Sequence, residues 1–246
     1  MSFFSNGAIN RVNLHTGVQA LAQSGGGIFF VVFLVRNGVA VPLALCAMAG
    51  IVLARLALRP LILPLARRLG IKPLLILGTL ILAAQYPLLA QVRGVGGALA
   101  LLCAVAAVGE VFYWTSYNAY FAAIGDAEWR GAQIGAREAL TSAAGIAAPL
   151  LGAWALVTFG PRAMFAGVGV LQALAALPLI GAPNVAVPAS APRAFAAARL
   201  GAILQGADGW FDSCFIFVWQ IALFVSLGAS FAASAKEWFS VRGVSA

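Results

Sequence analysis

Three acidic side chains of this sequence lie inside long apolar stretches, where a charge is costly. Glu110 is in the middle of one such stretch, and Asp208 and Asp212 share another. On insertion scales, a charge at the centre of a membrane span costs about 2.5–3.5 kcal/mol, so charged side chains there normally face a bundle interior or a water-filled cavity. These three carboxylates are therefore the first candidates for binding a substrate or a proton.

Aromatic side chains accompany Glu110. Residues three, four and seven apart share one face of a helix. This spacing places beside Glu110 the residues Tyr113, Trp114 and Tyr117, with Asn118 at the edge. Their O–H and N–H donors can hold a substrate by stacking and hydrogen bonding, and desolvation favours a protonated carboxyl group. The alternative is that Glu110 forms a structural ion pair with an arginine of a neighbouring helix.

A second polar stripe lies in the last apolar stretch. The same spacing puts on one side of that helix the residues Gln205, Asp208, Asp212 and Trp219. We expect this stripe to contact a substrate or an ion. The alternative is that its two acids lie near the membrane surface.

The elements that must position these side chains are membrane helices. The composition is 63% hydrophobic and only 9% charged, which leaves too little polar surface for a water-soluble globule. In lipid, each span must satisfy its own backbone hydrogen bonds, so stretches of this length are read as helices of about 20 residues. The sequence predicts an all-α, polytopic membrane helix bundle of about seven spans. They are 14–35, 39–58, 74–92, 96–123, 139–159, 163–182 and 200–227.

The domain organisation follows from a proline- and alanine-rich segment after the sixth span. Residues 1–182 are expected to form a six-helix bundle, and 183–199 a cytoplasmic linker. Residues 200–246 would then hold the first helix of an incomplete second half and a tail.

Lysine and arginine positions predict the orientation. Positively charged loops are retained in the cytoplasm, and a cytoplasmic N-terminus places ten of the fifteen basic residues on that side. The ten are Arg11, Arg55, Arg59, Arg67, Arg68, Lys72, Arg130, Arg137, Arg193 and Arg199. We therefore expect a multi-pass protein of the inner (plasma) membrane with its N-terminus in the cytoplasm. Topology and anionic lipids account for the net charge of +8, so no nucleic-acid partner is expected.

Enzyme and cofactor signatures are missing from the sequence. It has no Gly-x-Ser-x-Gly, His-Glu-x-x-His or Walker pattern, so no enzymatic activity is expected. Cys46, Cys103 and Cys214 form no Cys-x-x-Cys pattern and join no histidine cluster, so neither a metal site nor a cofactor is expected. The single histidine, His15, is interpreted as a hydrated residue at the cytoplasmic start of the first span.

A basic segment after the second predicted span resembles the signature loop of the major facilitator superfamily. That loop reads roughly Gly-x-x-x-Asp-Arg-x-Gly-Arg-Lys, and residues 63–72 align with it. The matching positions are Arg68, Gly70 and Lys72, whereas Leu63, Arg67 and Ile71 depart from the pattern. Arg67 stands in the place of the acidic residue through which the loop of that family latches one conformational state.

Two further segments resemble the same family. Residues 125–138 are similar to the short cytoplasmic link of bacterial facilitator proteins. Gly145, Pro149 and Gly152 match a glycine- and proline-rich stretch associated with proton-coupled antiporters. The alternative interpretation of these small residues is close helix packing alone.

The resemblance implies a fold and a function. Members of this family have two six-span halves with inverted three-helix repeats, so the seven spans here are expected to be an incomplete transporter or a natural half. The implied function is secondary active transport of a small molecule by alternating access, coupled to protons. The expected partners are the substrate, protons, the lipid bilayer, and a second half or further copies. The alternative is a non-transporting membrane fragment or assembly subunit that needs a partner chain.

The resemblance also implies a cytoplasmic gate. Its expected residues are Arg67, Arg68, Gly70, Lys72, Arg130 and Arg137. The alternative is that these basic residues only set the topology.

Overall fold

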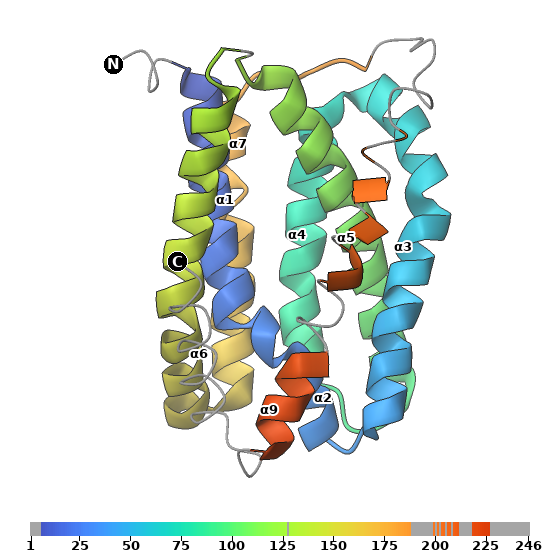
Figure 1. Ribbon diagram of the computed structural model, residues 1–246. Coiled ribbons are helices and arrows are strands. Elements are labelled where there is room, and N and C mark those ends of the chain that lie inside the picture. Colours follow the sequence, from blue (N-terminus) through green and yellow to red (C-terminus); the bar gives the residue numbers. More distant parts are fainter. Residues whose placement is uncertain are drawn as a thin grey trace.

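The computed structural model describes residues 6–126, 128–187, 199, 201, 203–204, 206–207, 209–211 and 218–226. Throughout these ranges the regular structure is helical. Its elements are α1 (Gly7–Gly25), η2 (Gly27–Phe29), α2 (Phe30–Arg36), α3 (Val41–Leu69), α4 (Ile71–Leu89), α5 (Gly97–Ile124), α6 (Arg130–Leu174), α7 (Leu177–Ile180) and α9 (Gln220–Ser226). The prediction of an all-α membrane helix bundle is confirmed (Figure 1).

Five helical stretches of the described chain are long and apolar enough to cross a membrane. The longest, Arg130–Ile180, contains Gly160 with non-helical backbone angles, so it consists of two spans joined at that residue. Each of the first six predicted spans therefore has a helix in the structure. The seventh, 200–227, is described only in part, and its helix α9 packs against α2.

The helix ends differ from the predicted spans. The second span, predicted to end at residue 58, continues as α3 to Leu69 although it contains Pro60 and Pro64. Each proline removes a helical hydrogen bond, but Ile62 and Ala66 are buried against α4 and α5, and this packing keeps the segment helical. The segment resembling the signature loop is therefore mostly helix, interrupted only at Gly70 between α3 and α4.

The first helix begins earlier than predicted, at Gly7 rather than at residue 14. Asn6 caps it, because the Asn6 side-chain oxygen accepts a hydrogen bond from the Ile9 amide at 3.1 Å. The first two turns of α1 contain polar residues, and for this reason the predicted span did not include them. The fifth span likewise starts at Arg130, ahead of the predicted residue 139.

Helix packing follows a pattern that repeats within the bundle. Numbering the spans in chain order, span one contacts spans five and six, span four contacts spans two and three, and span three also contacts span six. Exchanging spans one to three with spans four to six maps these pairs onto one another. The two triplets therefore pack in equivalent ways.

Close backbone approach holds the first and fifth spans together. Gly152 of α6 lies directly against the Gly25 carbonyl of α1, and a Cβ atom there would overlap it. One residue along, the first span also meets the sixth, because a Cβ on Gly26 would lie 2.6 Å from the Val168 side chain. Helix packing, one of the two interpretations of the glycine- and proline-rich stretch, thus has a direct structural basis at Gly152.

Candidate functional site

Glu110 lies midway along α5 and pairs with an arginine of α3. Arg55 Nη1 is 3.1 Å from Glu110 Oε2, and the two side chains are 30% and 24% exposed. The predicted alternative of a structural arginine partner is therefore present. Arg55 itself was expected in a cytoplasmic segment, and that expectation is wrong because α3 continues past it for several turns.

The aromatic side chains predicted beside Glu110 do pack together. The Tyr113 ring stacks on the Tyr117 ring, with centroids 5.5 Å apart and planes 11° from parallel. Trp114 meets both tyrosines edge-on, at 5.1 Å and 6.0 Å. Trp114 is half-buried, whereas both tyrosines are buried. We call Tyr113, Trp114 and Tyr117 the aromatic wall.

His15 is not the hydrated interfacial residue that the sequence suggested. It is fully buried, with Nδ1 2.7 Å from the Ala175 carbonyl oxygen and Nε2 3.1 Å from the Tyr113 hydroxyl. The prediction was wrong because α1 begins at Gly7, which moves His15 two turns inside the helix. His15 thus joins α1, α5 and the end of α6.

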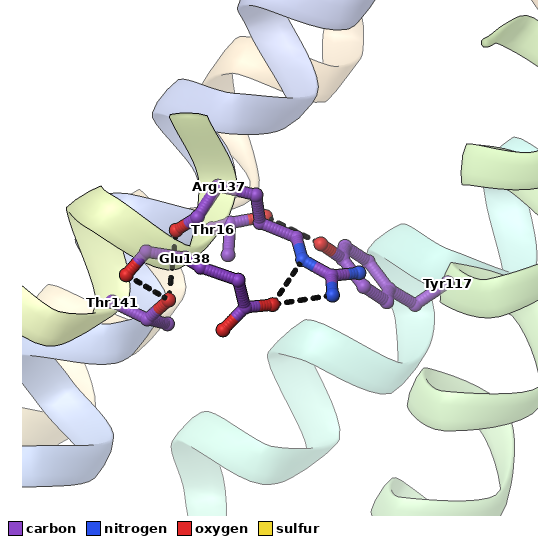
Figure 2. A network of polar contacts seen from close by, with 5 residues as sticks. All are labelled: Thr16, Tyr117, Arg137, Glu138 and Thr141. Atoms are coloured by element: carbon purple, nitrogen blue, oxygen red, sulfur yellow. Dashed lines mark hydrogen bonds and ion pairs between the residues drawn. The ribbon is translucent and has the colours of Figure 1, made fainter. Parts of the chain in front are cut away.

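A second polar cluster connects α1, α5 and α6 on the side of Tyr117 (Figure 2). The Thr16 and Tyr117 hydroxyls are 2.9 Å apart. Arg137 lies beside the Tyr117 hydroxyl, with its guanidinium carbon 5.2 Å from the centre of the Phe121 ring. Arg137 Nε also donates to Glu138 at 3.0 Å. Arg137 is therefore on a helix of the bundle wall, with a quarter of its side chain exposed, and its role in a gate stays a prediction.

Of the remaining predicted binding residues, the structure describes Asn118 and Trp219. Asn118 is exposed at the edge of its helix face, as expected from the spacing. Trp219 is 40% exposed. Gln205, Asp208 and Asp212 lie outside the described residues, so the second polar stripe stays a prediction.

The predicted gate residues divide into two groups. Arg67, Arg68 and Arg130 are exposed at the bundle end where α1 begins. Gly70 and Lys72 instead contact the chain that follows α7. The Lys72 ammonium donates to the carbonyls of Ile180 at 3.2 Å and Ala182 at 2.8 Å, a favourable place for a cation at a helix C-terminus.

The described start of the predicted linker crosses the turn between α3 and α4. The Asn184 side chain donates to the Leu69 carbonyl at 3.0 Å and accepts from the Lys72 amide at 3.2 Å. The Ile71 amide donates to the Val185 carbonyl at 2.9 Å. Residues 182–187, which we call the strap, are therefore tied to this turn.

Replacing Gly70 with alanine is expected to destabilise the protein by about 2 kcal/mol. Gly70 has a φ of 87°, and a Cβ there would also overlap the Asn184 side chain. Thermal unfolding in detergent measures the effect. The matched control is Gly50→Ala in α3, where a Cβ meets nothing within 4 Å. Equal melting temperatures for the two variants would contradict the contact between the strap and the turn.

The site combines two ion pairs with an aromatic wall. Sequence reasoning missed His15, Thr16 and Arg55 as its members. Only the helical phase of α1 pointed to the first two, because Thr16, Gln19 and Gln23 continue a polar line along that helix. In the described part of the chain, no group of three or more His, Cys, Asp or Glu side chains is placed to hold a metal ion.

No protein-family model matches this chain, and no curated protein matches it either. The class that the structure defines is a membrane-embedded bundle of α-helices.

Proposed function

We propose that this protein is a secondary active transporter that moves a small molecule by alternating access, with Glu110 as the proton-coupling group. The observation that carries the proposal is the Arg55–Glu110 pair, which lies inside membrane-spanning helices and is a quarter to a third exposed. Charged side chains at this depth avoid lipid and face protein or water. A water-filled substrate path beside the aromatic wall fits that requirement.

The equivalent packing of the two helix triplets supports the same proposal. Transporters with internal inverted repeats place their binding sites near the midplane, where the repeats meet. Glu110 belongs to span four and Arg55 to span two, so the pair bridges the two triplets in the middle of the bundle. The similarity of residues 63–72 to a signature loop points to the major facilitator superfamily.

Competition between a proton and Arg55 for the Glu110 carboxylate provides the step that couples proton binding to substrate binding. Its Oε2 atom binds Arg55 at 3.1 Å, and a proton on this carboxyl would remove the charge that holds the guanidinium. Arg55 would then be free to bind an anionic or polar substrate group while Trp114 and Tyr117 stack on the rest of the molecule. Loss of the proton would restore the ion pair and release the substrate.

The distribution of basic residues supports a cytoplasmic N-terminus. Arg67, Arg68, Lys72 and Arg130 all lie at the bundle end where α1 starts and α5 ends (Figure 1). Arg55 no longer counts toward this side, because it lies within α3. The inner (plasma) membrane is the compartment that we propose.

Glu110→Gln is expected to abolish dependence of uptake on the pH gradient while leaving membrane insertion intact. Glutamine keeps the size and the hydrogen-bonding oxygen but cannot exchange a proton in this pH range. The measurement is uptake or efflux by the purified protein in vesicles, with a pH gradient and a pool of labelled metabolites plus tetraphenylphosphonium. Glu128→Gln, which alters an exposed acid at the bundle end, is the matched control.

The outcomes are distinct. Uptake by Glu110→Gln with unchanged pH dependence would refute the role of this carboxyl. Well-folded protein that moves no probe would instead favour the alternative, a non-transporting membrane subunit. The same part-exposed ion pairs suit that alternative, since a partner chain could cover them.

A further inference from the structure

We propose that His15 is a positioning residue: as a neutral ring with its hydrogen on Nδ1, it holds the Tyr113 hydroxyl and thereby orients the aromatic wall beside Glu110. The effect of this role on uptake rests on the proposed function. The effect on the orientation of Trp114 does not depend on transport, so the two effects can be tested separately.

The Nδ1 side of the ring has a defined role. A carbonyl oxygen can only accept, so the contact of 2.7 Å with Ala175 requires a hydrogen on Nδ1. This carbonyl is available because α6 ends there and the Leu179 amide donates to Ala176 instead. His15 thus supplies the missing donor at a helix end.

The Nε2 side then acts as the acceptor. A neutral imidazole with its hydrogen on Nδ1 has a lone pair on Nε2, and the Tyr113 hydroxyl lies 3.1 Å from it. A charged ring at this fully buried position would need an anionic partner. The two carboxylates of the site are paired elsewhere, Glu110 with Arg55 and Glu138 with Arg137.

Tyr113 is held at both its backbone and its hydroxyl. Gly78 of α4 lets the helices approach so closely that a Cβ there would lie 2.5 Å from the Tyr113 amide nitrogen. With the backbone fixed in this way, the bond to His15 determines where the ring lies. The ring in turn stacks on Tyr117 and abuts the edge of Trp114, which is one helical turn from Glu110. The hydrogen bond from Tyr113 to His15 therefore orients the Tyr113 ring of the wall, while the Tyr117 hydroxyl lies 2.9 Å from that of Thr16.

The tautomer can be observed directly because His15 is the only histidine of the chain. Nitrogen-15 labelling of histidine should give one pair of ring signals, with Nδ1 protonated and Nε2 an acceptor. Tyr113→Phe should shift the Nε2 signal toward that of a lone pair without a hydrogen bond. A doubly protonated ring, or a hydrogen on Nε2, would overturn the proposal.

The positioning effect can be read from Trp114 in a variant whose other tryptophans are phenylalanine. His15→Asn keeps an amide nitrogen near the place of Nδ1 but has no atom in the place of Nε2. We expect it to lower the fluorescence anisotropy of Trp114 as much as Tyr113→Phe does, with no further loss in the double variant. His15→Gln, whose amide oxygen can accept from Tyr113, should restore most of the signal.

The control for this experiment is Tyr120→Phe. It removes a hydroxyl that donates to the Pro183 carbonyl rather than to a residue of the wall, and should leave Trp114 unchanged. Folded Tyr113→Phe protein with the anisotropy of the parent would overturn the positioning role, even if His15→Asn did not fold. For a probe that the parent protein transports, His15→Asn should raise KM about fivefold with kcat little changed. If the parent transports no probe, only the proposed function fails.

Discussion

Replacing Arg55 with leucine is expected to destabilise the protein by about 2 kcal/mol. The change leaves the Glu110 carboxylate inside a membrane span without the guanidinium that now lies 3.1 Å away. Removing one partner of a fully buried pair costs roughly 3–5 kcal/mol. The expected effect is smaller here because both side chains are partly exposed and Glu110 can take up a proton.

Arg59→Leu is the matched control, because it removes an exposed arginine one turn further along α3. It should change the free energy of unfolding by less than about 0.5 kcal/mol. The double variant Arg55→Leu with Glu110→Leu removes both charges and should recover most of the lost stability. Unfolding in mixed detergent micelles measures all three proteins. Equal stability for Arg55→Leu and Arg59→Leu would show that the pair contributes nothing to the fold.

The membrane helices and the Glu110 face were predictable because both depend on local properties of the chain. Hydropathy locates a span, and the spacing of three and four residues groups Tyr113, Trp114 and Tyr117 with Glu110. The contacts in the structure agree with that grouping. Helix phase within one span is therefore readable from the sequence alone.

Contacts between helices were not predictable in the same way. The predicted end of the second span stopped short of Pro60, so Arg55 was counted with the cytoplasmic segments rather than placed inside the bundle. His15 was misplaced because polar residues hid the first two turns of α1. In both cases tertiary packing decides where the helix begins or ends. A side chain that the sequence places near a helix end, such as Arg55 or His15, can therefore lie inside the bundle instead.

The strap shows a related limit. Its proline-rich sequence correctly excluded a helix for residues 183–187, but nothing local indicated that Asn184 would bind the turn at Gly70. The predicted gate therefore holds two different kinds of residue. Lys72 caps backbone carbonyls, whereas Arg67 and Arg68 stay exposed.

Gly152→Ala is expected to have an effect of about 3 kcal/mol or more on unfolding. The added Cβ would overlap the Gly25 carbonyl oxygen and lie 2.8 Å from its carbon, so backbone rather than a flexible side chain must move. Overpacking a well-packed interior typically costs about 1–3 kcal/mol, and rigid backbone on both sides puts this site at the upper end. The measurement is again unfolding in mixed micelles.

Gly135→Ala in the same helix separates this clash from the general effect of the substitution. A Cβ at Gly135 meets nothing within 4 Å, so the variant should be more stable by about 0.5–1 kcal/mol, because alanine favours helix. Opposite signs for the two variants would establish the contact between α1 and α6. If Gly152→Ala behaved like Gly135→Ala, α1 would not lie against α6 at this level.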